Sequence, residues 1–257
     1  MGGKTVRLEV ATPKDADLMF ELAMVAFAPD EPTSGALANP REEVGDAYRE
    51  AFADYLQYPY SIIAFDGDKP IAYYANKALD VKDLKEKEEI DVIEEKNGNV
   101  IGRPKKDLGP EIDEVNKTFK SREGARLVAL LNHFDLMTRN FIPKDATKLY
   151  RQGQLGVIRE YRQQQLTPFL FKKHAQLGVE AGFKYIDGLF TASGTEAYAL
   201  NAGMKHTLEV PYKEFMDHGE RIYKKPIGDG KERLTYMIGH VEEMARYKVE
   251  VPGYGIF

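Results

Sequence analysis

Cysteine is absent from this chain of 257 residues, and its absence excludes several kinds of chemistry at once. Without cysteine there is no disulfide, no thiolate metal site and no cysteine nucleophile. Long apolar runs are also lacking, and none approaches the length that a membrane-spanning helix needs. The start, from Met1 to Lys4, leads straight into a polar strand pattern. We therefore expect a cytoplasmic location and no membrane partner.

An excess of positive charge is missing as well. The chain carries 36 Lys and Arg residues against 41 Asp and Glu residues, which gives a formal net charge of −5. No global field attracts nucleic acid, so we expect no nucleic-acid partner. What is present is an ordinary globular composition, 43% hydrophobic and 30% charged, in a chain long enough to bury a substantial core.

The spacing of apolar residues predicts a mixture of strands and helices. Thr12 and Pro13 are typical of a helix start, and the helix that follows must end before Pro29. Further helices are expected at 44–56, 123–141, 163–181 and 193–202. Strands are expected at 7–11, 60–65, 71–77, 149–158, 185–190, 206–215 and 233–241. This order predicts one mixed α/β domain of three layers over residues 1–257.

Residues 82–120 differ from the rest because they are rich in charges of both signs and poor in aromatic residues. Asn97-Gly98 and Arg103-Pro104 are turn signals within this segment. We expect a solvated, charged insertion with one or two short helices and partial disorder.

The most informative segment covers residues 155–167 and reads L-G-V-I-R-E-Y-R-Q-Q-Q-L-T. It resembles the acetyl-CoA motif of the GNAT superfamily of N-acetyltransferases, in which a strand turns tightly into a helix with the pattern R/Q-x-x-G-x-G/A. Backbone N–H groups at such a helix start converge on a pyrophosphate, and the peptide dipoles favour its charge. Arg162 matches the leading basic position, whereas Gln165 and Thr167 replace the two glycines. Glycine keeps a Cβ away from the phosphate, so these replacements loosen the site unless their side chains donate to it.

Further segments, in matching order, resemble the aralkylamine N-acetyltransferases of insects and nematodes, a group that is dopamine N-acetyltransferase-like. They are Asp30-Glu31-Pro32, His133-Phe134-Asp135 and the stretch 210–223. The resemblance spans about residues 5–247 and fails in the insertion. It implies the GNAT fold, a mixed α/β (α+β) arrangement with a mostly antiparallel central sheet and helices on both faces. The fourth and fifth strands of that sheet, here 149–158 and 185–190, splay apart.

The resemblance also implies where acetyl-CoA binds as co-substrate. The pantetheine arm lies between the splayed strands and pairs with the main chain of Leu155 and Val157 like an added strand. A backbone N–H near Val157 polarises the thioester carbonyl. The diphosphate lies at the turn formed by Arg162, Gln163, Gln164, Gln165, Leu166 and Thr167.

Three residues are implied in catalysis. An aliphatic ammonium titrates at about 10, so the attacking amine must lose a proton to a base. Glu31 fills the position of the base in the insect enzymes, although a solvated turn before Pro32 explains it equally. Thr191 and Thr195 stand where the insect enzymes carry two serines on the proton path to the leaving thiolate, and both also suit capping of the next helix. Without a cysteine, we expect direct attack by the amine in a ternary complex.

Three functions remain open on the sequence. The first is acetyl transfer to a small primary amine, either an aralkylamine or a polyamine. The second keeps the fold but takes another acceptor, such as an amino acid, and the third is a regulatory CoA-binding protein without turnover. The five histidines have no metal-ligand spacing, so we expect no metal. Monomer and homodimer are both compatible with the sequence.

Overall fold

The computed structural model describes residues 4–37, 40–164, 166–224, 227–248 and 254–256. The first part of the chain follows the expected order of a strand, helices and a hairpin. Its first long helix buries apolar residues that recur at helical spacing. The elements are β1 (Lys4–Val10), η1 (Pro13–Asp15), α1 (Ala16–Ala26), α2 (Pro32–Gly35), α3 (Pro40–Tyr55), β2 (Ile62–Asp66) and β3 (Lys69–Asp80).

Residues 82–120 form regular elements that extend the sheet, which corrects the expectation of partial disorder. Most of their side chains are exposed or partly exposed, as expected for a solvated segment. After η2 (Val81–Asp83) these residues form β4 (Ile90–Lys96), β5 (Asn99–Pro104) and one short helix, α4 (Gly109–Val115). Asn97 and Gly98 join β4 to β5 with φ values of 53° and 79°. These left-handed values suit an Asn-Gly hairpin turn. The hairpin is stable here because β5 also pairs in parallel with β8, a strand far along the chain.

The second half alternates between helices and strands as expected, with shifted ends. The helix expected at 163–181 begins only at residue 166, because Gln163 has a φ of 62°, which a right-handed helix does not contain. The strand expected at 206–215 ends at Pro211. The elements are α5 (Arg122–Thr138), η3 (Arg139–Phe141), β6 (Lys148–Val157), η4 (Arg159–Tyr161), α6 (Leu166–Glu180), β7 (Tyr185–Phe190), α7 (Ser193–Asn201), β8 (Lys205–Pro211), η5 (Tyr212–Glu214), β9 (Met216–Asp217), β10 (Glu220–Arg221), β11 (Arg233–His240), α8 (Val241–Arg246) and β12 (Tyr254–Ile256).

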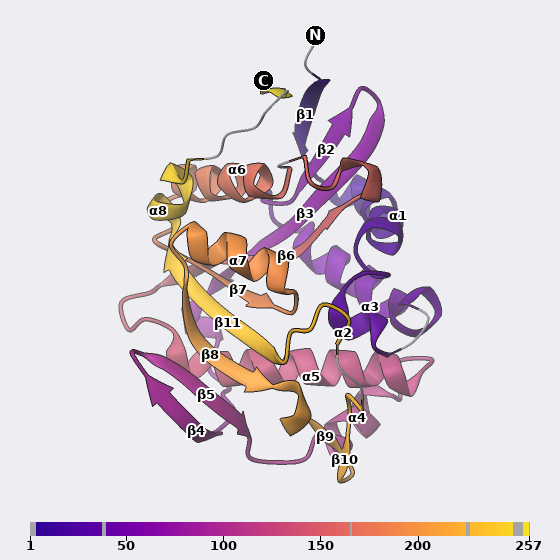
Figure 1. Ribbon diagram of the computed structural model, residues 1–257, viewed down its shortest axis with the longest axis vertical. Helices are drawn as coiled ribbons and strands as arrows, with labels where there is room; N and C mark the ends of the chain where they lie inside the picture. The colour runs from indigo at the N-terminus through magenta and orange to yellow at the C-terminus, as the bar shows by residue number, and fades with distance from the viewer. Residues whose placement is uncertain (1–3, 38–39, 165, 225–226, 249–253, 257) are drawn as a thin grey trace.

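One twisted sheet runs through the molecule in the order β12-β1-β2-β3-β6-β7-β11-β8-β5-β4. Most neighbours are antiparallel, and the parallel pairs are β1 with β12, β6 with β7 and β5 with β8. The helices α6 and α8 cover one face, while α1, α3 and α5 cover the other (Figure 1). Among the described residues, no helix has the length and apolar composition needed to cross a membrane.

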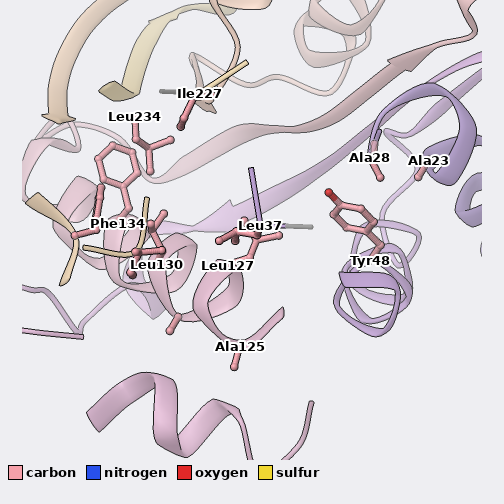
Figure 2. Close-up of a cluster of buried hydrophobic side chains, with 14 of the residues drawn as sticks. Ala23, Ala28, Leu37, Tyr48, Ala125, Leu127, Leu130, Phe134, Ile227 and Leu234 are labelled. Atoms are coloured by element: carbon pink, nitrogen blue, oxygen red, sulfur yellow. The ribbon is translucent and has the colours of Figure 1, made fainter. Parts of the chain in front are cut away.

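The two faces of the sheet carry two separate apolar clusters. Figure 2 shows part of the first, where Leu127 and Leu130 of α5 lie beneath Ile227 and Leu234. Tyr48 of α3 continues this cluster towards the C-terminal part of α1. Residues of α1, α3 and α5 therefore share one apolar cluster with residues 222–227, which follow β10.

Candidate active site

The strands β6 and β7 are hydrogen-bonded only along the first half of β6. Their parallel pairing runs from Leu149 with Tyr185 to Gln152 with Gly188, and it stops there. The rest of β6 pairs with β3 alone, as in Tyr74 with Leu155 and Ala72 with Val157. Within the described part of the chain, the other edge of β6 from residue 153 to 157 has no partner strand. The expected splay between the two strands is confirmed.

The free edge of β6 presents the main-chain groups of two residues named from the sequence. The N–H of Ile158 donates to the carbonyl of Ile71 in β3 at 3.0 Å. Because main-chain groups alternate sides along a strand, those of Leu155 and Val157 face away from β3, towards the gap. In agreement, the Val157 carbonyl accepts a hydrogen bond from Arg162 Nε at 2.8 Å. An extended ligand laid along this edge would find strand-like donors and acceptors.

Beyond the gap the chain turns into the N-terminus of α6. Gln163 holds the left-handed conformation of this turn, and the Gln164 side-chain amide donates to the Glu160 carbonyl at 2.8 Å. Leu166 and Thr167 are the first residues of α6, so Thr167 has ordinary helical backbone. Gln165 lies outside the described residues. The turn thus ends in a 15-residue helix whose first N–H groups lack helical partners, the arrangement that binds anions.

Arg162 connects this turn to the Asp-Glu-Pro loop. Besides the Val157 carbonyl, its guanidinium donates to the Ala26 carbonyl at 2.9 Å and to Asp30 Oδ2 at 2.7 Å. Arg159 Nη2 donates to the other oxygen of Asp30 at 2.6 Å. Hydrogen bonds from Arg159, and then from Arg162, lower the pKa of Asp30. The Arg162 side chain therefore fixes α1 and the loop against β6, and its guanidinium is already engaged with protein groups.

Glu31 is buried at the start of α2, with only 5% of its surface exposed. Its carboxylate caps the helix by accepting from the N–H groups of Thr33 and Ser34 at 3.1 and 2.6 Å. The side-chain hydroxyls of Thr33 and Ser34 each donate to the same carboxylate at 2.6 Å. The Ser34 hydroxyl has a single proton and gives it to Glu31, so the Tyr48 hydroxyl, 2.5 Å from Ser34 Oγ, must donate in turn. A hydrogen-bonded chain runs from Tyr48 through Ser34 to Glu31.

Four tyrosines from separate elements surround this carboxylate. They are Tyr48 of α3, Tyr73 of β3, Tyr212 of η5 and Tyr223. Burial raises the pKa of each, and the charge of Glu31 raises each further. Tyr212 and Tyr223 are in edge contact at 5.3 Å between ring centroids. A single carboxylate within a tyrosine-lined site combines a place for a cation with a place for an aromatic ring.

Tyr73 also joins the tyrosine cluster to the free part of β6. Its hydroxyl donates to the Gln154 side chain at 3.3 Å, and its ring lies against Gly156. A Cβ at Gly156 would come within 2.5 Å of Tyr73 Cε1 and 3.3 Å of the Ala26 Cβ. Glycine is therefore needed at this position so that Tyr73 and α1 can approach the strand.

Thr191 directly follows β7, on the opposite side of the gap, and Thr195 lies in the first turn of α7. The Thr191 carbonyl accepts from the Tyr212 hydroxyl at 3.4 Å, which ties it to the tyrosine cluster. The Thr195 hydroxyl donates to the Ala192 carbonyl at 3.2 Å, and neither residue caps α7. That cap comes instead from Asp229, which accepts from the Ser193 N–H at 2.7 Å. The capping alternative drawn from the sequence is therefore wrong for both threonines.

Sequence reasoning named Glu31, Leu155, Val157 and the turn as site residues, which stays a prediction. It did not name Tyr48, Tyr212 or Tyr223 as lining the site. Tyr212 and Tyr223 fall within the stretch 210–223 that carries the resemblance, which is the signal that marks them. Tyr48 has no such signal.

No protein-family model matches the chain, and no curated protein matches it either. Solved structures do match over most of its length. Arylalkylamine N-acetyltransferase 2 from Aedes aegypti is 19% identical with a TM-score of 0.70, and the match covers 92% of this chain and 99% of that one. The polyamine N-acetyltransferase of Drosophila melanogaster, which forms N-acetylagmatine, is 14% identical with a TM-score of 0.67, covering 91% and 99%. A mosquito arylalkylamine N-acetyltransferase like 5b is 18% identical with a TM-score of 0.66, covering 92% and 100%.

This chain has the GNAT fold. Where the GNAT sheet begins to splay, a buried ion network holds β6 and β7 together. Arg151 of β6 donates to Asp187 of β7 through Nε at 2.9 Å and Nη2 at 2.5 Å, and to Asp135 of α5 through Nη1 at 2.5 Å. The Tyr236 hydroxyl also donates to Asp187 Oδ2, at 3.1 Å. Arg151 and Asp187 directly precede Gln152 and Gly188, the last residues that pair between β6 and β7. The ion pair therefore fixes the point at which the strands separate.

One further cluster of polar residues has metal-ligand character. Glu88, Glu111 and His133 bring ligand atoms within 4.8 Å of one another. The ammonium of Lys106 lies 2.8 Å from Glu88 and 3.2 Å from Glu111, so these carboxylates already have a cation. His133, part of the His-Phe-Asp match, uses Nδ1 to contact Glu111 of α4 at 3.1 Å. The cluster thus ties the inserted segment to α5.

Proposed function

We propose that this protein is an acetyl-CoA-dependent N-acetyltransferase that acts on a small primary amine. The single observation that carries this proposal is the unpaired edge of β6, which leads into the α6 N-terminus and lies against Tyr73, one of the tyrosines around the buried Glu31. The similarity of the fold to N-acetyltransferases supports it.

The acetyl-CoA half of the site uses main-chain groups. The pantetheine arm pairs with Leu155 and Val157, and the diphosphate meets the turn formed by Gln163, Gln164, Gln165, Leu166 and Thr167. The Val157 N–H polarises the thioester carbonyl as charge develops on its oxygen. Arg162 acts by positioning, since its guanidinium holds the Val157 carbonyl and Asp30.

The amine half of the site centres on Glu31. The amine must be neutral to attack, and its proton passes to Glu31 through a hydroxyl of Thr33 or Ser34, or through water. Attack on the thioester is direct, because the chain has no cysteine to form an acyl-enzyme. For the leaving thiolate, the proton path implied by the resemblance passes through the hydroxyls of Thr191 and Thr195.

Among acceptors, the site favours an arylalkylamine over a polyamine. A polyamine carries several charges and calls for several carboxylates, whereas tyrosines predominate around Glu31. An aromatic ring beside an ammonium matches that surface through stacking and charge pairing. The CoA-binding regulator without turnover, and an acceptor such as an amino acid, are the alternatives to test.

The test is a screen for thiol release from acetyl-CoA against arylalkylamines, polyamines and amino acids. We expect turnover with at least one arylalkylamine. Glu31→Gln should lower kcat by about 10²-fold or more at neutral pH, and less at high pH, where the free amine is already neutral. Glu50→Gln, at an exposed position of α3, is the matched control. Thermal unfolding of both variants checks that the α2 cap survives.

The outcomes separate the alternatives. Tight CoA binding by calorimetry without thiol release for any amine would favour the regulatory function. Turnover with an amino acid, and with no other amine, would show that the acceptor is an amino acid. A protein that does not bind CoA at all would overturn the proposal.

A further inference from the structure

One of the four tyrosines around Glu31 has a hydroxyl group without a partner. The other three hydroxyls are hydrogen-bonded within the protein; they belong to Tyr48, Tyr73 and Tyr212. Tyr223 is only 6% exposed, and among the residues that the structure describes its hydroxyl has no hydrogen-bond partner. Such a group is uncommon in a folded protein, because a buried hydroxyl without a partner costs free energy.

The Tyr223 hydroxyl lies near the Glu31 carboxylate. Burial raises the pKa of Tyr223 most, the charge of Glu31 raises it further, and the Thr33 side chain lowers it. Electrostatic influences weaken with distance, so both residues are close to the hydroxyl. Thr33 gives its own proton to Glu31, and no hydrogen bond of normal geometry joins Thr33 to Tyr223. The Tyr223 oxygen is therefore free to accept a proton donor.

Contacts also connect Tyr223 to both strands that border the gap. Its ring is in edge contact with Tyr212, whose hydroxyl is bonded to the carbonyl of Thr191, directly after β7. On the other side, the charge of Glu31 reaches Tyr73, whose ring lies against the free part of β6. Tyr73, Tyr212 and Tyr223 share one apolar cluster. The unpartnered hydroxyl therefore belongs to the amine half of the proposed site.

The Glu31 carboxylate has room for one further donor. Its Oε2 atom accepts three hydrogen bonds, from the Thr33 hydroxyl and from the N–H and hydroxyl of Ser34. Within the described part of the chain, Oε1 accepts only one, from the Thr33 N–H at 3.1 Å. A carboxylate oxygen has two lone pairs, so Oε1 retains one. Two acceptors thus lie near each other beside a negative charge, and a cation with several N–H groups satisfies both.

We propose that Tyr223 binds the acceptor, its hydroxyl oxygen and Glu31 Oε1 together holding the primary ammonium group of an arylalkylamine. This inference rests on the proposed function. A primary ammonium carries three N–H groups, of which one is donated to Tyr223 and a second to Glu31. After the loss of one proton to Glu31 the neutral amine still has two N–H groups. The contact with Tyr223 is therefore kept while the nitrogen lone pair attacks the thioester.

Tyr223→Phe tests this inference because it removes only the unpartnered oxygen. The free protein loses no hydrogen bond, so we expect urea unfolding to give a free energy equal to or above that of the wild type. With phenethylamine as acceptor, KM should rise by about 10-fold or more while kcat changes little, because the contact is made in the ground state and the transition state alike. KM for acetyl-CoA should be unchanged.

Tyr185→Phe is the matched control. Tyr185 begins β7, and its hydroxyl donates to Asp145 at 2.8 Å on the surface. This variant loses the same atom at a position away from the gap. We expect both KM values to equal those of the wild type.

A second readout does not depend on turnover and shows which end of the acceptor Tyr223 contacts. Phenethylamine and tyramine are titrated calorimetrically into the wild type and Tyr223→Phe in the presence of CoA. The two amines share the ammonium group and differ only in the ring hydroxyl of tyramine. We expect Tyr223→Phe to lose about 10-fold or more in affinity for both amines equally.

Three results would each overturn the inference while acetyl transfer stands. Unchanged affinity for both amines would mean that the hydroxyl takes no part in acceptor binding. A loss confined to tyramine would place Tyr223 at the ring end of the acceptor. Lower stability of Tyr223→Phe would mean that the hydroxyl has a partner in the folded protein. Turnover of the wild type with polyamines or amino acids alone would also overturn it, whereas absence of CoA binding or of any turnover would overturn the proposed function itself.

Discussion

His174 of α6 is a histidine that the fold keeps neutral. It is fully buried, with its ring 4.1 Å from Tyr150 and 4.7 Å from Tyr74 between centroids. In the described part of the chain neither ring nitrogen has a hydrogen-bond partner. Burial lowers the pKa of His174 well below its ordinary value. Protonation of this ring therefore favours the unfolded chain.

The sign and size of the effect follow from linkage. The unfolded chain takes up a proton at His174 below a pH of about 6.5, whereas the folded chain does so only at much lower pH. Above a pH of about 6.5 the protonation of His174 costs no stability. As the pH falls below about 6.5, the free energy of unfolding decreases by about 1.4 kcal/mol per pH unit. Between pH 6.5 and 5 the loss amounts to about 2 kcal/mol, a large part of a typical stability of about 5–15 kcal/mol.

Replacement of His174 by Phe isolates this effect. Phenylalanine keeps the ring between Tyr150 and Tyr74 but cannot be protonated. We expect urea unfolding at pH 7.5 to give a free energy equal to or above that of the wild type, because two unpaired buried nitrogens are removed. At pH 5 the variant should exceed the wild type by about 2 kcal/mol more than at pH 7.5. His240→Gln, at an exposed position, should show no such difference.

Parallel pH profiles for wild type and His174→Phe would refute this reasoning. They would mean that the folded chain accommodates the charged ring, for example by opening α6 locally to water.

Three further predictions concern the site. Gly156→Ala should lower the free energy of unfolding by about 1–3 kcal/mol and weaken CoA binding in calorimetry, because the new Cβ meets Tyr73 at 2.5 Å; unchanged CoA affinity would contradict the placement of the pantetheine arm. Arg162→Gln removes the hydrogen bonds to Val157, α1 and the Asp-Glu-Pro loop, so we expect a loss of about 1–3 kcal/mol in urea unfolding and a raised KM for acetyl-CoA. Arg151→Met leaves the Asp187 carboxylate buried without its cation, and should cost about 3–5 kcal/mol in the same assay, with partial recovery when Asp187→Asn is added.

Outside residues 82–120, the sequence alone determined the order of the main helices and strands, because apolar periodicity is a local property. It did not predict β4 and β5. The strand at 185–190 was predicted with its observed limits. The run from β6 through a turn into α6 was also predicted, because the turn and the helix start are encoded by neighbouring residues. Asn97-Gly98 was predicted as a turn, and its left-handed backbone is typical of that residue pair, but the hairpin strands on either side were not predicted.

Tertiary structure decided what those elements do. No strand was expected in the segment 82–120, and it joins the sheet because β8 offers a free edge that no local pattern reveals. Glu31 is a buried cap within a tyrosine cluster, because α3, β3 and η5 meet above it. The cap of α7 likewise depends on a contact between distant segments. Hydrogen bonds and burial are set by which surfaces pack together, and packing is a property of the whole chain.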